Sequence, residues 1–155
     1  MRKLILVAVL MLPLHAEMFD LQFERLATAL AGLSTPDRSV VDDAVALIRK
    51  GENNLALAKL SALNKQSPKN SSLRILTAYT LLRAGDTVGA LDNAKQAEAS
   101  PDGDAYKCWF LAKVAFLTGD SPTCKREINH AKTHMKNDAT ITADLKSMEK
   151  GLAKK

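Results

Sequence analysis

The sequence has few of the residues that are typical of loop-rich, aromatic-rich or disulfide-rich proteins. Aromatic residues make up 5% of its 155 residues, and it contains seven glycines, five prolines and two cysteines. So few turn-forming residues argue against an all-β protein, and two cysteines exclude a disulfide-dense miniprotein. Hydrophobic residues at 46% and charged residues at 25% are instead typical of a globular protein, and the length suits one domain.

The sequence also has no apolar run long enough for a comfortable membrane span. Its longest run, Leu4 to Leu14, follows two basic residues and precedes a cleavage-type tripeptide that ends at Ala16. A positive start and an apolar run shorter than the roughly 20 residues of a span are typical of a secretory signal peptide. We therefore predict a signal peptide at residues 1–16, export to the periplasm or secretion, and no stable membrane span after cleavage. An uncleaved membrane anchor is the alternative.

A concentrated basic surface is missing as well. The formal net charge of +5 falls to +3 when Arg2 and Lys3 leave with the signal peptide, and the remaining basic residues are interleaved with acidic ones. Nucleic-acid binding normally needs a dense basic patch. The charge pattern therefore predicts solvated helix faces and no nucleic-acid partner.

Three glycines recur with a period of 34 residues, at Gly51, Gly85 and Gly119. An acidic residue follows each glycine, an alanine lies seven positions before it, and a small residue lies five positions after it. Agreement in size at one fixed spacing indicates an internal repeat. Apolar residues at helical spacing on both sides of each glycine predict a unit of two helices, with the glycine ending the first in a left-handed conformation.

The small residues on either side of each glycine have a mechanical role. Two antiparallel helices joined by a tight turn cross most closely at a fixed distance from the turn, where small side chains let the backbones approach. The residues predicted at these crossings are Ala44 with Ala56, Ala78 with Ala90, and Ala112 with Cys124.

The repeat resembles the tetratricopeptide family. The motif of that family has a large and a small residue on the first helix, then an alanine, an apolar residue and a proline on the second. The third copy lacks the closing proline, and the early aromatic residue of the family is replaced by Val40, Arg74 and Cys108. The matching residues are Ala44, Leu47, Ala56, Leu60 and Pro68 in the first copy, Ala78, Leu81, Ala90 and Ala94 in the second, and Leu111, Ala112, Ala115, Ile128 and Ala131 in the third.

The resemblance implies an all-α, right-handed superhelical solenoid of three helix-turn-helix units. We place the repeats at residues 37–70, 71–104 and 105–138 of a single domain that spans 17–155. Apolar stripes at helical spacing predict an N-terminal helix at 17–33 and a C-terminal capping helix at 139–153. The helices predicted for the second and third copies span residues 72–84, 87–99, 104–118 and 122–136.

The resemblance further implies a concave groove lined by the first helix of each unit. Both tyrosines and the single tryptophan of the chain fall on this face. An apolar groove suits an apolar peptide or an amphipathic helix. The family's clamp for C-terminal carboxylates is not carried over, because only Lys113 is clearly in place. The residues predicted to line the groove are Val41, Val45, Ile48, Ile75, Tyr79, Leu82, Tyr106, Trp109, Lys113 and Phe116.

We therefore predict a non-enzymatic protein-protein interaction scaffold or adaptor in the periplasm or envelope. Three occupants of the groove remain open: an external protein partner, the chain's own N-terminal helix through Phe19 and Phe23, or a second copy of the chain. Self-association through the same groove would make the protein structural. Replacing Trp109 and Tyr79 by alanine is expected to abolish partner binding while helix content stays nearly unchanged.

Other candidate chemistry in the sequence is sparse. Cys108 and Cys124 could form a disulfide in an exported protein, but their expected levels differ by about one helical turn, so two small core residues are the alternative. His130 and His134 have a spacing that can serve zinc, yet no glutamate follows His130, and we predict surface histidines. The sequence thus predicts no metal, no cofactor and no catalytic residue.

Overall fold

The computed structural model describes residues 33–98, 105–134 and 138–154. The predicted signal peptide and nearly all of the predicted N-terminal helix lie outside these ranges. The described ranges contain seven helices and no strand, which confirms the all-α class for this part of the chain. The helices are α2 (Thr35–Arg49), α3 (Asn53–Gln66), α4 (Ser71–Ala84), α5 (Thr87–Glu98), α6 (Ala105–Thr118), α7 (Ser121–His134) and α8 (Ala139–Leu152).

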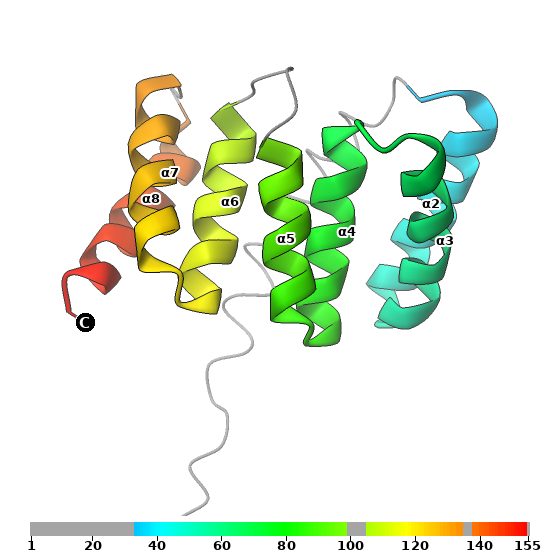
Figure 1. The fold of residues 1–155 in the computed structure, drawn as a ribbon, viewed down its shortest axis with the longest axis horizontal. Helices are drawn as coiled ribbons and strands as arrows, with labels where there is room; N and C mark the ends of the chain where they lie inside the picture. The colour runs from blue at the N-terminus through cyan, green and yellow to red at the C-terminus, as the bar shows by residue number, and fades with distance from the viewer. Residues whose placement is uncertain (1–32, 99–104, 135–137, 155) are drawn as a thin grey trace, which may run out of the picture.

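The helices lie side by side in chain order, and their connections alternate between the two edges of the row (Figure 1). The main contacts join helices that are neighbours in sequence, and further contacts join α4 to α6 and α6 to α8. The bounds agree closely with those predicted for the helices of the second and third copies and for the C-terminal helix. Within the described ranges, no helix is both long and apolar enough to cross a membrane.

The three glycine turns share one hydrogen-bond pattern. In the first turn, the Gly51 N–H donates to the Ile48 carbonyl at 3.0 Å, and the Glu52 N–H donates to the Leu47 carbonyl at 2.9 Å. These two bonds define a Schellman motif, which needs a residue in the left-handed conformation that only glycine adopts at little cost. The φ angles of Gly51, Gly85 and Gly119 are 82°, 87° and 82°. The equivalent bonds run from Gly85 to Leu82, Asp86 to Leu81, Gly119 to Phe116 and Asp120 to Ala115.

The acidic residue after two of these glycines caps the next helix. Asp86 Oδ1 accepts a bond from the Gly89 N–H at 2.9 Å, and Asp120 Oδ1 accepts one from the Thr123 N–H at 3.2 Å. The hydroxyl of Thr123 also donates to Asp120 Oδ2 at 2.8 Å, and this bond is the main cause of the lowered pKa of Asp120. A glycine-aspartate pair therefore ends one helix and begins the next.

The residues at the predicted crossings are all fully buried. Each of the six small side chains is 0% exposed. Full burial of a small residue from each helix is expected where two backbones approach most closely. The predicted position of the crossings is therefore consistent with the structure in all three hairpins, and larger apolar side chains such as Leu60, Leu76 and Ile128 complete the core beside them.

Enlarging a crossing residue should destabilise the protein. Ala78→Leu adds three carbon atoms at a site with no exposed surface, and we expect overpacking to lower the free energy of unfolding by about 1–3 kcal/mol. Ala84→Leu is the matched control, because Ala84 is exposed on the same helix. Urea denaturation followed by circular dichroism measures both variants. Equal stability of the two would contradict the packing argument.

Candidate functional site

The side chains predicted to line an open groove lie mostly inside the protein. Leu82, Tyr106 and Phe116 are partly buried and pack against the core. Because α4 and α6 contact helices on several sides, both of their apolar faces can be covered within the chain. The other seven predicted groove positions are buried, so they form no open surface in this structure. Their part in partner binding stays a prediction. The buried seven are Val41, Val45, Ile48, Ile75, Tyr79, Trp109 and Lys113.

Trp109 and Lys113 hold the C-terminal helix. They lie one turn apart on α6, and both contact Asp144 of α8. Trp109 Nε1 donates to Asp144 Oδ2 at 3.0 Å, and Lys113 Nζ donates to Asp144 Oδ1 at 2.6 Å. The side chains of the ion pair are only 6% and 4% exposed. Lys113, predicted as the single cation of the groove, thus neutralises a buried carboxylate.

Asp144 was not singled out by the sequence reasoning, although the sequence carries a signal for it. The apolar stripe of α8 runs through Ile141, Leu145 and Met148, and Asp144 falls on the same face at the i+3 position. An acidic side chain on a buried stripe needs a cation or several donors, because an unpaired buried charge is very costly. That requirement predicts a cation or donor on a helix that packs against α8.

The alternative of a disulfide is wrong for this structure. Cys108 and Cys124 are not joined, and they are not within disulfide distance. Cys108 lies eleven residues before Gly119 and Cys124 only five after it. Their positions along the hairpin therefore differ by six residues, about 9 Å along the helix axis at 1.5 Å per residue. This is more than the one turn expected from the sequence, and it exceeds the roughly 7 Å that a bridge allows between Cα atoms. The other alternative, a small core residue, describes Cys124, which is 0% exposed.

Burial should also make the Cys124 thiol unreactive. Desolvation, assisted by the charge of Asp120, raises the pKa of Cys124 from 9.0 to about 11. In a Cys108→Ala variant at pH 8, we expect iodoacetamide to modify Cys124 only after unfolding, as read by mass spectrometry. Because the folded state holds this proton more tightly, stability should fall as the pH rises from 9.0 towards 11. Rapid alkylation of the native variant would contradict the burial.

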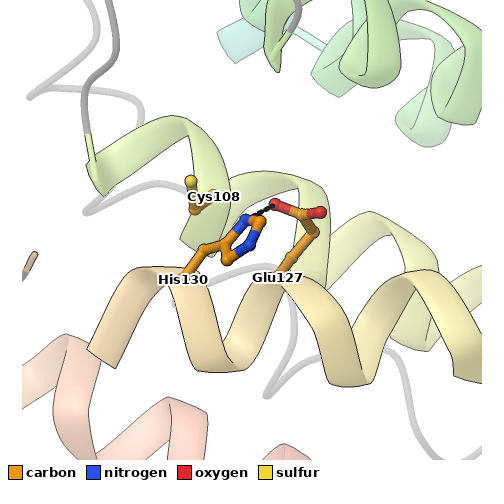
Figure 2. A group of neighbouring side chains, drawn as sticks. All are labelled: Cys108, Glu127 and His130. Atoms are coloured by element: carbon orange, nitrogen blue, oxygen red, sulfur yellow. Dashed lines mark ion pairs between the residues drawn. The ribbon is translucent and has the colours of Figure 1, made fainter. Parts of the chain in front are cut away.

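A second group of side chains joins α6 and α7. A ligand atom from each of Cys108, Glu127 and His130 lies within 4.8 Å of the other two (Figure 2). His130 Nδ1 and Glu127 Oε2 are 3.6 Å apart. His130 and His134 are exposed, as predicted, but the residues that could act with His130 are Cys108 and Glu127. The sequence contains a signal for this group. Cys108 lies eleven residues before Gly119 and His130 eleven residues after it, so the two residues are equally far from the turn on facing helices.

A hollow of about 470 Å³ crosses three consecutive helices, α3, α4 and α5. Leu57 and Leu81 contribute apolar surface, and Lys65 and Arg74 contribute positive charge, with no acidic residue in the described lining. Asn64 donates from Nδ2 to Thr77 Oγ1 at 2.6 Å, while its buried Oδ1 has no hydrogen-bond partner among the described residues. The hollow therefore offers an apolar surface and two cations, and the unpaired Asn64 Oδ1 lies buried beneath it.

Comparison with known proteins does not identify a family. No protein-family model matches this chain, and no curated protein matches it. The tetratricopeptide resemblance therefore rests on the residue pattern and its period of 34, and membership of that family stays a prediction.

Proposed function

We propose that the chain is a right-handed superhelical solenoid of three tetratricopeptide-like hairpins that acts as a non-enzymatic protein-protein interaction scaffold. Three turns with the same two hydrogen bonds, spaced by 34 residues, support a repeated unit. The row of helices, in which the main contacts join neighbours, supports stacking of these units (Figure 1). Stacked hairpins offer an extended surface on which a protein partner can bind. Export to the periplasm or envelope is part of the proposal and rests on residues 1–16 alone.

The hollow across α3, α4 and α5 is the observation that carries the binding function. Its volume falls within the range of about 300–1,000 Å³ found for ligand sites. Lys65 and Arg74 favour an acidic side chain, and Leu57 and Leu81 favour an apolar one. These features together suit a partner segment that carries both apolar and acidic residues.

Charge reversal in the hollow tests this function. Lys65 is exposed, so Lys65→Glu should leave the fold intact while it repels an acidic partner segment. The full chain with a C-terminal affinity tag is expressed in its own host, and captured proteins are identified by mass spectrometry. Lys146→Glu on α8 is the matched control for net charge. A partner retained by the wild type and the control but lost with Lys65→Glu supports the proposal. If the wild type, Lys65→Glu and Lys146→Glu recover the same proteins in equal amounts, the proposal is contradicted.

Self-association is the second candidate, and exposed apolar side chains at one edge favour it. Leu55, Val88 and Leu117 are 57%, 72% and 36% exposed, and each lies within four residues of a glycine turn. The three glycine turns lie at the same edge of the row (Figure 1). Sedimentation equilibrium over a range of concentrations tests this candidate, with glutamate at all three positions as the variant. A wild-type mass that stays at one chain contradicts it.

A further inference from the structure

The buried carboxylate of Glu127 is only half satisfied. The side chain is 0% exposed, and Arg126 Nε donates to its Oε1 at 2.6 Å. Oε2 is also buried, and it accepts no hydrogen bond from the described residues. The His130 imidazole lies 3.6 Å from Oε2 and pairs with it as a cation only when it is protonated. A buried anionic oxygen without a hydrogen bond is costly, so this atom calls for an explanation. A bound cation is one physical way to stabilise it.

The groups nearest to this oxygen are the ones that bind zinc. His130 Nδ1 lies 3.6 Å from Glu127 Oε2. One imidazole nitrogen of His130, one carboxylate oxygen of Glu127 and the Cys108 sulfur all lie within 4.8 Å of one another (Figure 2). Thiolate, imidazole and carboxylate are the three protein ligands that zinc takes. Magnesium and calcium prefer oxygen ligands alone, so this mixed set disfavours them.

The hairpin holds these three donors in place. Glu127 and His130 form a Glu-x-x-His pair on α7, and residues three apart on a helix lie on one face. Helical-bundle metal proteins use the same pair to supply two ligands from one helix. Cys108 comes from the facing helix α6 at the level of His130, because the two residues are equally far from Gly119.

The distances are close to those of a metal centre. Tetrahedral zinc with bonds of about 2.0–2.3 Å places its ligand atoms roughly 3.3–3.6 Å apart. His130 Nδ1 and Glu127 Oε2 are already 3.6 Å apart, and a ligand atom from each of the three residues lies within 4.8 Å of the other two. The imidazole of His130 is 52% exposed, so it can rotate to close the remaining gap.

We propose that Cys108, Glu127 and His130 bind one zinc ion per chain. The three side chains supply three of its four ligands, and the exposed side at His130 leaves the fourth position to water or to a group from outside the chain. The inference is independent of the hollow across α3, α4 and α5, which shares no residue with this site.

Titration of the full chain with Co²⁺ and Zn²⁺ tests the site. Co²⁺ bound to a thiolate gives a near-ultraviolet charge-transfer absorption, and Zn²⁺ should displace it at one equivalent. We expect Cys108→Ser to remove this absorption. His130→Ala should weaken Zn²⁺ binding, measured against a chromophoric chelator, by more than about 100-fold, because even outer-shell partners of a metal site are worth 10–100-fold.

Matched variants separate this site from other metal binding. Cys124→Ala removes the other cysteine of the same hairpin, and His134→Ala removes the other histidine of α7; both should bind as the wild type does. Should Cys108→Ser fail to fold by circular dichroism, the exposed His130→Ala variant decides. Absence of the cobalt absorption in the wild type would overturn the proposal, as would equal Zn²⁺ affinity of His130→Ala and His134→Ala.

Discussion

Replacing Lys113 by methionine should lower the free energy of unfolding by about 3–5 kcal/mol, the cost of breaking a buried ion pair by removal of one partner. The methionine fills a similar volume but leaves the Asp144 carboxylate buried without its cation, with only the hydrogen bond from Trp109 Nε1 remaining among the described residues. Chemical denaturation followed by far-ultraviolet circular dichroism measures the loss. The expected result is either a large shift of the midpoint or partial unfolding without denaturant.

Two further variants make this result specific to burial. Lys132→Met breaks the exposed pair between Lys132 and Glu149, which also joins α8 to its neighbour, and should cost no more than about 1 kcal/mol. Asp144→Asn added to Lys113→Met removes both buried charges while an amide oxygen still accepts from Trp109, so much of the stability should return. If Lys113→Met lowered the free energy of unfolding as little as Lys132→Met does, the buried pair would contribute no more to stability than the exposed one.

Trp109→Ala should destabilise the protein by about 3–5 kcal/mol through loss of packing alone. Trp109 is 1% exposed, its ring lies 5.4 Å from that of Tyr106, and its Nε1 is a donor to Asp144. Addition of Tyr79→Ala removes a second buried ring, and we now expect the double variant to lose much of its helix content. The groove prediction, which places both side chains on an open surface, expects the opposite result.

Circular dichroism is the suitable readout, because removal of the only tryptophan also removes its fluorescence signal. Trp109→Phe is the control: it keeps an aromatic ring but loses the bond to Asp144, and should cost about 1–2 kcal/mol. If the double variant kept the helix content and the stability of the wild type, Trp109 and Tyr79 would be surface residues after all.

Local features of the fold could be predicted from the sequence, because local interactions specify them. Gly51, Gly85 and Gly119 mark left-handed turns, the acids after them precede helix starts, and the alanines at fixed distances mark the crossings. These signals act over a few residues, so each copy of the repeat carries them in full. Their spacing of 34 residues then predicts where each pair of helices lies along the chain.

Contacts between helices were predicted less well. An apolar face on α4 or α6 has the same pattern whether it packs against another helix or awaits a partner, so Tyr79 and Trp109 were placed on a surface. Asp144 pairs with Lys113, 31 positions earlier in the chain, and Glu127 lies near Cys108, 19 positions earlier, so neither role can be inferred from local sequence. A comparison of positions on either side of the Gly119 turn brings Cys108 opposite His130 rather than Cys124, whereas the pairing of Asp144 with Lys113 depends on the packing of α8 against α6.

The order of helix contacts along the row has a consequence for folding. Because the main contacts join helices that are neighbours in sequence, the chain needs to close only short loops, and the entropic cost of closure is small. A hairpin with its turn already formed can therefore serve as a nucleus wherever it lies, and structure can spread from it in both directions. Helix α8 lies at the C-terminal end of this row, and the buried ion pair of Lys113 with Asp144 ties that end to α6, so it limits the local opening expected at a terminal helix as well as adding to the stability of the whole domain.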